Sequence, residues 1–164
     1  MIATASVLQI EQILTFQLAE EAYGLEILKV QEIRGWESVR VLPNTPGFIK
    51  GALNLRGVIV PIIDLRERFG MQTVEYSPST VVIVLYINDG KHARVMGIVA
   101  DSVSDVLDIK TDDIKSPPKL GTNIDTRYMR GIYVHKNNMV MLLDVDKLLK
   151  LDEFEAIADI GGEI

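Results

Sequence analysis

The sequence predicts an all-β protein with minor helix, built from two small β-barrels that pack together. Three observations carry this prediction: many short runs rich in Val and Ile, tight hairpin turns between them, and an internal repeat. The chain of 164 residues is 48% hydrophobic and 24% charged, so it can bury a substantial core and is too apolar for a disordered protein.

The first half of the chain contains a series of predicted strands. Leu14, Phe16 and Leu18 alternate with polar residues, which is typical of a strand with one buried face. Further apolar runs that predict strands lie at 23–27, 30–34, 39–42, 48–55 and 58–63. These runs are short and closely spaced, as in a small barrel.

Turn and cap residues delimit the end of this half. Arg56-Gly57 predicts a tight hairpin turn, because glycine adopts the positive φ that such a turn requires. Pro61 cannot donate a backbone hydrogen bond, so we expect its strand to lie at an edge or to carry a bulge. Asp64 predicts the N-cap of a short helix in a capping-box pattern with Glu67, which ends at Gly70.

A polar, turn-rich segment, 71–80, is the predicted linker to a second series of strands. These strands are expected at 81–87, 93–100, 103–109, 128–135 and 139–143, with turns at 88–90 and 137–138. Asp144 predicts the cap of a short closing helix that carries Val145, Leu148 and Leu149 on one side. We therefore expect barrel 1 at about 12–79, barrel 2 at about 80–150, and flexible ends at 1–11 and 159–164.

The two halves match each other in pattern. Residues 23–33 align with 96–106, so that Gly24 falls on Gly97 and Val30 on Val103. Residues 48–51 align with 128–131, and Asp64 then falls on Asp144. This favours duplication of a small barrel, with chance agreement between β-rich segments as the alternative. The seam between the barrels, where exposed apolar residues could meet, is the expected binding groove.

Composition and motifs exclude several classes of function. The net charge of −6 argues against a nucleic-acid or polybasic membrane binder, and the lack of cysteine excludes thiolate chemistry. His92 and His135 are too far apart in the sequence to indicate a metal site, and the acidic stretch 101–113 lacks EF-hand spacing. Phosphate-binding motifs are absent. We expect neither catalysis, nor a metal, nor a cofactor.

Localisation follows from what the sequence lacks. The longest apolar run, 81–87, is too short to span a bilayer, and the N-terminus does not have the pattern of a secretory signal. We therefore expect a cytoplasmic protein without direct membrane insertion.

Four segments together resemble one known family. They are YGLEILKVQEIRGWESV (23–39), NTPGFIKGALNLRGVIVPIIDLRERF (44–69), TVVIVL (80–85) and GIVADSVSDVLDI (97–109). They resemble the CheW-like domain family of bacterial chemotaxis coupling proteins, and the likeness runs from about 12 to 149. It implies two SH3-like five-stranded barrels and a non-enzymatic adaptor. Such an adaptor links the cytoplasmic tips of chemoreceptors (methyl-accepting chemotaxis proteins) to the regulatory domain of the histidine kinase CheA, in arrays at the inner face of the membrane.

The resemblance also implies which residues couple to receptors. They are Val30, Glu32, Gly51, Arg56, Val81, Gly97, Val103 and Val106. The valines would line an apolar groove, and the glycines would allow close approach or fix the backbone. Glu32 and Arg56 would pair across barrel 1 and orient a guanidinium toward a receptor. From the residues alone, core packing explains the valines equally well, and a turn arginine such as Arg56 is ordinarily only solvated.

Two alternatives remain open at this stage. The chain could be the coupling protein of a chemosensory pathway that does not control motility. It could instead be a double-barrel enzyme or small-ligand-binding protein that uses the cleft between the barrels.

Overall fold

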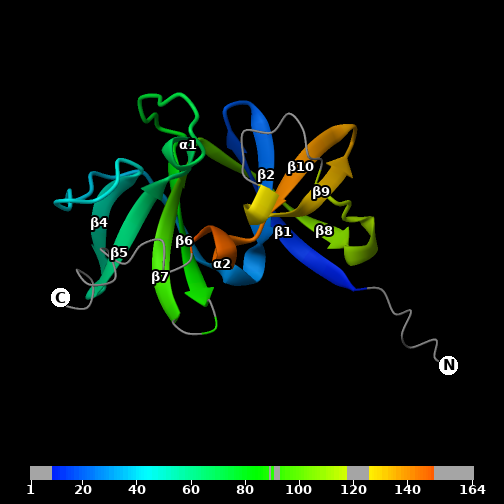
Figure 1. Cartoon of the computed structure of the whole chain (residues 1–164), viewed down its shortest axis with the longest axis horizontal. Coiled ribbons are helices and arrows are strands. Elements are labelled where there is room, and N and C mark those ends of the chain that lie inside the picture. Colours follow the sequence, from blue (N-terminus) through cyan, green and yellow to red (C-terminus); the bar gives the residue numbers. More distant parts are fainter. Residues whose placement is uncertain (1–8, 89, 91–92, 118–125, 150–164) are drawn as a thin grey trace.

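The computed structural model describes residues 9–88, 90, 93–117 and 126–149. Within these residues, ten strands form two five-stranded sheets, which curl into two adjacent barrels (Figure 1). We call barrel A the sheet with strand order β8-β1-β2-β10-β9, and barrel B the sheet with order β3-β6-β7-β5-β4. The all-β fold class with two five-stranded barrels is confirmed.

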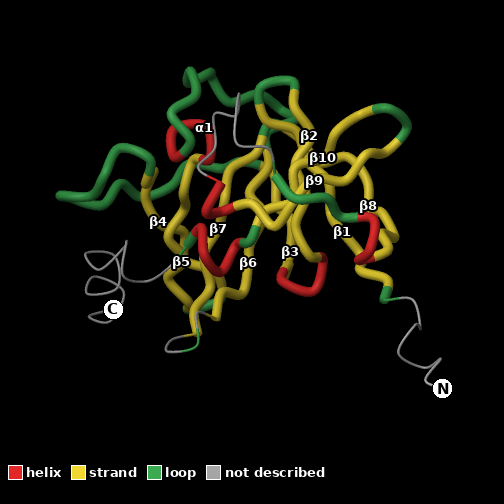
Figure 2. Tube along the Cα trace, turned by 45° about the vertical axis from the view of Figure 1, so that its right-hand side comes forward, coloured by secondary structure: helices red, strands yellow, loops and turns green. Residues whose placement is uncertain are grey.

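The strands of barrel A are β1 (Ile10–Leu18), β2 (Glu21–Glu26), β8 (Ser102–Lys110), β9 (Met129–His135) and β10 (Asn138–Leu143). Those of barrel B are β3 (Val30–Gly35), β4 (Ile49–Leu55), β5 (Val58–Asp64), β6 (Val81–Asn88) and β7 (Ala93–Ala100). The short helices are η2 (Ile27–Lys29), α1 (Leu65–Arg68), η3 (Thr111–Asp113), η4 (Thr126–Tyr128) and α2 (Val145–Leu148) (Figure 2).

The expected division of the chain between residues 79 and 80 is wrong. Barrel A combines β1 and β2 from the first half with β8, β9 and β10 from the second, and barrel B combines β3, β4 and β5 with β6 and β7. The segment 71–80 joins two parts of barrel B, so it is not a linker between barrels. Local patterns identify strands, but pairing between distant strands decides which sheet each one joins.

The topology supports the predicted repeat. Replacing β1 to β5 by β6 to β10, and the reverse, converts the strand order of barrel A into that of barrel B. The parallel strand pairs agree as well: Leu142 lies opposite Gly24 in barrel A, and Ile62 lies opposite Gly97 in barrel B. Each repeat therefore contributes its first two strands to one barrel and its last three strands to the other.

Three apolar clusters hold the fold together. One cluster lies within barrel A and includes Ile13 and Val140, and another lies within barrel B and includes Val60 and Val82. The largest cluster draws on both barrels and fills the space between them. The interior of the seam is therefore a hydrophobic core, and only its surface is available to a partner.

The predicted turn at Arg56-Gly57 and the helix caps at Asp64 and Asp144 are confirmed, whereas the turn expected at 137–138 lies at Lys136-Asn137. Arg56 and Gly57 have φ values of 52° and 86°, as a two-residue hairpin turn of the primed type requires. The Asp64 carboxylate accepts from the first turn of α1, and the Asp144 carboxylate does the same for α2. The expected capping box is wrong: the Glu67 carboxylate accepts from Lys50, and the backbone amide of Asp64 donates to the Phe48 carbonyl instead.

Three local predictions are wrong. Pro61 lies neither at an edge nor in a bulge, because β5 runs between β4 and β7; its missing donor is tolerated because pairing with β7 begins only at Ile62. The expected strand 39–42 is reduced to one bridge at Arg40, since Pro43 cannot extend a ladder. The expected flexible end 1–11 overlaps β1, which begins at Ile10. Residues 1–8 and 159–164 lie outside the described residues.

Candidate functional site

Edge strand β3 presents apolar side chains to the seam from barrel B. Val30 lies opposite Leu85 and Ile33 lies opposite Ile83, and both partners belong to the inter-barrel core. Residues directly opposite each other on neighbouring strands share one face, so Val30 and Ile33 point toward the seam. Val81, at the start of β6, also packs against this core.

Edge strand β8 does the same from barrel A. Val103 lies opposite Phe16 and Val106 lies opposite Leu14, and both partners belong to the inter-barrel core. The two edge strands thus border the seam, one from each barrel.

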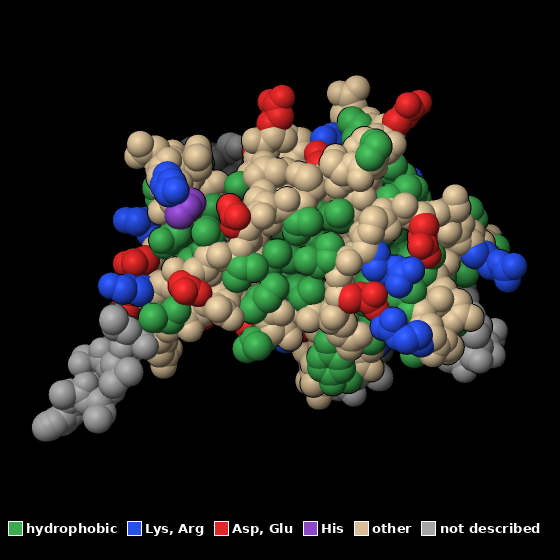
Figure 3. Space-filling view, turned by 180° about the vertical axis from the view of Figure 1, so that it is seen from behind, with side chains coloured by type: hydrophobic (Ala, Val, Ile, Leu, Met, Phe, Trp, Pro, Cys, Tyr) green, Lys and Arg blue, Asp and Glu red, His purple; other side chains and the backbone are tan. Residues whose placement is uncertain are grey.

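We call the side chains at this border the seam strip. Its members are Val30, Ile33, Val81, Val103 and Val106. Ile33 is 41% exposed and Val106 is 49% exposed, whereas the other three are half-buried. Figure 3 shows hydrophobic side chains gathered in the middle of the face opposite to that of Figure 1, with charged groups beside them. Apolar patches of this kind mark interaction sites.

The two walls of the seam strip are formed by β3 and β8, which are equivalent strands of the two repeats. Val30 corresponds to Val103 and Ile33 to Val106 in the alignment of 23–33 with 96–106. Sequence reasoning selected Val30, Val103 and Val106 but missed Ile33. The repeat contained the signal, since Ile33 aligns with a residue that had been selected.

The Glu32–Arg56 pair forms as expected. Arg56 donates from Nη2 to Glu32 Oε1 at 2.5 Å, and Arg34 lies 3.4 Å from the other oxygen. The pair connects β3 to the β4–β5 turn, the two ends of the sheet, and so helps to close barrel B. The hydrogen bond from Arg56 is the main cause that lowers the pKa of Glu32. The Arg56 side chain is 74% exposed and accessible to a partner.

The two selected glycines lie inside barrel B. Gly51 has a φ of 148°, and a Cβ there would collide with the backbone carbonyl of Arg40. A Cβ at Gly97 would meet the side chains of Ile62 and Val82 at 2.7 and 2.9 Å. Of the two roles expected for these glycines, the geometry fits the one of fixing the backbone, because neither lies in the seam strip.

The described residues contain no cluster of three or more His, Asp or Glu side chains suited to a metal ion. His135 stacks on Tyr133 in β9, and His92 lies outside the described residues. None of the helices in the described part of the chain combines the length and apolar character needed to cross a bilayer.

Comparison with known proteins identifies the family of this chain. The family model described as CheW-like domain matches residues 12–153. The chain is 47% identical to the chemotaxis protein CheW of Klebsiella aerogenes over 151 residues, covering 92% of this chain and 89% of that protein. It is 33% identical to the chemotaxis protein CheW of Treponema pallidum over 153 residues, covering 91% and 88%.

A solved structure shares the fold. The crystal structure of the scaffolding protein TtCheW from Thermoanaerobacter tengcongensis superimposes with a TM-score of 0.78 at 35% identity, covering 87% of this chain and 89% of that one. The family model, the curated relatives and the two-barrel architecture agree, and the chain belongs to the CheW-like family of chemotaxis proteins.

Proposed function

We propose that this chain is a non-enzymatic adaptor that couples chemoreceptors to the histidine kinase CheA in bacterial chemotaxis. The family and the name of the related scaffolding protein support the adaptor role. The observation that carries the proposal is the seam strip, an exposed apolar surface to which both barrels contribute.

The seam strip suits a helical partner. The family resemblance implies that receptor tips are helical hairpins. An amphipathic helix binds by placing its apolar face against an apolar surface. Val30 and Ile33 would contact one side of the helix, and Val106 the other side. The exposed guanidinium of Arg56 would pair with a carboxylate or carbonyl of the receptor, while Glu32 holds it in place.

The two barrels act as one rigid body because the largest core lies between them. A rigid adaptor can alter kinase autophosphorylation by fixing the position of the kinase relative to the receptor. The regulatory domain of the kinase would bind a surface outside the seam strip, so that both partners are held at once. Each contact is expected to be modest and to gain strength from repetition in an array.

The proposal includes a location. The adaptor would be cytoplasmic and would reach the inner face of the membrane only through the receptors it binds. The net charge of −6 opposes direct binding to an anionic membrane surface.

Autophosphorylation of a purified CheA-type kinase tests the proposal. The kinase is assayed with receptor signalling fragments, with and without this protein. We expect stimulation that requires all three components. Arg56→Ala should reduce the stimulation while leaving the circular dichroism spectrum unchanged. The matched control is Lys136→Ala, since Lys136 occupies the equivalent turn of barrel A with a φ of 49°, close to the 52° of Arg56.

The same assay separates the alternatives. Lack of stimulation by a folded protein with matched partners would contradict the adaptor role and favour a ligand-binding double barrel. Stimulation with receptors of a non-motility pathway, and not with motility receptors, would favour a coupling protein of a chemosensory pathway that does not control motility.

A further inference from the structure

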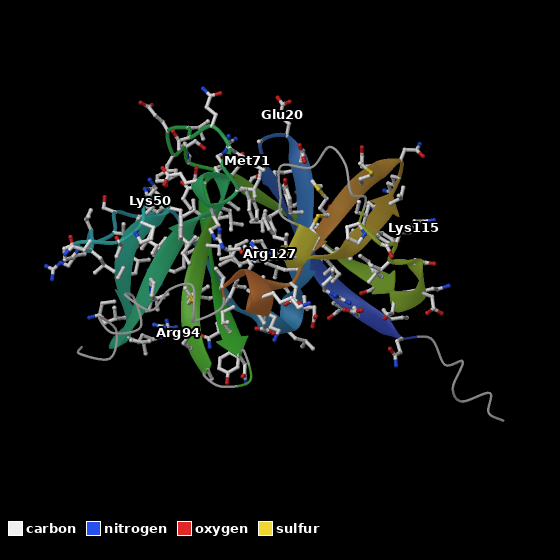
Figure 4. All side chains as sticks on the ribbon, in the orientation of Figure 1. Glu20, Lys50, Met71, Arg94, Lys115 and Arg127 are labelled. Carbon is white, nitrogen blue, oxygen red and sulfur yellow. The ribbon has the colours of Figure 1, made fainter. Side chains whose placement is uncertain are left out.

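The surface of barrel B has an open cavity of about 470 Å³ that shares no lining residue with the seam strip. Its lining includes Trp36 and Val39 from the chain after β3, Lys50 from β4, Asp64 and Glu67 around the start of α1, and Tyr76. Figure 4 shows Lys50 on the same side of barrel B as the loop that follows α1.

One wall of the cavity is aromatic. The rings of Trp36 and Tyr76 have centroids 4.2 Å apart and are tilted by 52°. The Tyr76 hydroxyl donates to Asp64 Oδ2 at 2.5 Å, which anchors the segment 71–80 to barrel B. Burial, followed by this hydrogen bond, raises the pKa of Tyr76 and keeps the hydroxyl protonated. Aromatic faces of this kind attract cations.

The lining also includes a carboxylate, that of Glu67. Lys50 Nζ donates to Glu67 Oε1 at 2.6 Å. Glu67 Oε2 is buried and has no hydrogen-bond partner among the described residues. A buried carboxylate oxygen without a donor carries a desolvation cost that a bound donor would relieve.

The repeat shows what this part of the fold can hold. Arg130 of barrel A corresponds to Lys50, Asp144 corresponds to Asp64, and both line a cavity of about 210 Å³. The Arg130 guanidinium donates two hydrogen bonds, of 2.7 and 2.9 Å, to the carboxylate of Glu11 in β1, outside that cavity, and Lys147 stands at the position that corresponds to Glu67. Barrel B has Lys50 at this position, which is shorter and carries a single nitrogen. Its ammonium group donates to only one oxygen of the Glu67 carboxylate.

We propose that the barrel B cavity is a docking pocket for an arginine side chain of a partner protein. The guanidinium pairs with the Glu67 carboxylate and stacks on the Trp36–Tyr76 wall. Arginine suits both contacts because its planar group stacks on aromatic rings and presents several donors, whereas a lysine ammonium is compact and strongly hydrated. This contact is separate from the receptor surface and does not depend on the proposed function.

Trp36 is the single tryptophan of the chain, so intrinsic fluorescence reports directly on the pocket. The probe is a blocked glycine–arginine–glycine tripeptide, compared with blocked peptides that carry glutamine or lysine in place of arginine, and with free arginine. We expect a saturable fluorescence change with the arginine peptide, a weaker one with the lysine peptide, and none with the glutamine peptide.

Two variants with opposite expected effects on binding distinguish the proposal from misfolding, which would weaken binding in both. Glu67→Gln should weaken binding by about tenfold, because it removes the charge that the guanidinium meets. Lys50→Met should strengthen binding, because it frees the second oxygen of Glu67 and removes a competing cation. Asp108→Asn, at an exposed acid of β8, is the matched control and should bind as the wild type does.

An equal response of Glu67→Gln and wild type would overturn the proposal, as would an equal response to the glutamine peptide. An equal response to the lysine peptide would overturn the assignment to a guanidinium. Binding of free arginine without binding of the peptide would overturn the assignment to a protein partner.

Discussion

The ion pair between Arg66 and Asp101 is predicted to fix the two barrels relative to each other. Arg66, in α1, donates from Nε and Nη2 to the Asp101 carboxylate at 2.9 and 2.6 Å. The same carboxylate accepts from the backbone amide of Ala19, in the β1–β2 turn of barrel A, at 2.9 Å. Asp101 therefore connects the two barrels.

The expected loss in the free energy of unfolding depends on how deeply the Arg66–Asp101 pair is buried. The Arg66 side chain is 15% exposed and that of Asp101 is 30% exposed, so the pair lies between a surface and a fully buried ion pair. Removing one partner of a fully buried pair costs roughly 3–5 kcal/mol. We expect Arg66→Met to lower the free energy of unfolding by about 3 kcal/mol at neutral pH. With a typical urea slope of about 2 kcal/mol/M, the midpoint falls by about 1.5 M.

The pH dependence provides a second signature. Burial raises the pKa of Asp101, but the hydrogen bonds from Arg66 and from the Ala19 amide outweigh it and hold the pKa below its ordinary value of 3.8. The stabilisation is therefore complete above that value and is lost as the pH falls through the lowered pKa. The difference between wild type and Arg66→Met should shrink in acid.

Urea denaturation at neutral and acid pH measures both effects. Arg34→Met is the control, because Arg34 is 30% exposed and its contacts with Glu32 and Glu37 are long, at 3.4 and 3.3 Å, so that its loss should change stability less. A loss below about 1 kcal/mol for Arg66→Met at neutral pH would refute the reasoning, since that is the range of surface pairs. So would a loss that stays constant in acid.

Three further predictions concern two glycines and an ion pair. Gly51→Ala should lower the free energy of unfolding by more than about 2 kcal/mol, because its Cβ would collide with backbone at a φ of 148°. Gly57→Asn should be tolerated, since Asn137 holds the equivalent place with a φ of 68°; equal melting temperatures of the two variants would argue against this account. Arg130→Met should raise the pKa of Glu11 toward its ordinary value of 4.5, because the hydrogen bond from Arg130 is the main cause of its lowering. An NMR titration of the Glu11 carboxyl measures this, and an unchanged pKa would contradict it.

Local structure was largely predictable from the sequence, whereas the assembly of the strands was not. The turn at Arg56-Gly57 and the caps at Asp64 and Asp144 depend on neighbouring residues, and they formed as predicted. The membership of β3 and β8 depends on pairing with residues at least 46 positions away in the chain, and local patterns contain no information about such pairing. The repeat identified equivalent elements, but it did not indicate that each half of the chain contributes strands to both barrels.

The candidate site was predictable in part. The Glu32–Arg56 pair was expected from the family resemblance, and it closes barrel B as a real contact. Ile33 was missed because an alternating strand does not reveal which of its faces meets the second barrel. The cavity beside Trp36 was not predicted, since it joins residues from four separate parts of the chain.

Receptor binding by seam-strip variants tests the central claim most directly. Ile33→Arg and Val106→Arg place a charge on opposite walls of the strip, whereas Met139→Arg places one at a 60% exposed apolar residue elsewhere in barrel A. The account predicts that both seam variants, folded by circular dichroism, bind receptor signalling fragments at least about tenfold more weakly than the wild type, and that Met139→Arg binds normally. Wild-type binding by either seam variant would contradict the claim that one receptor contacts both walls.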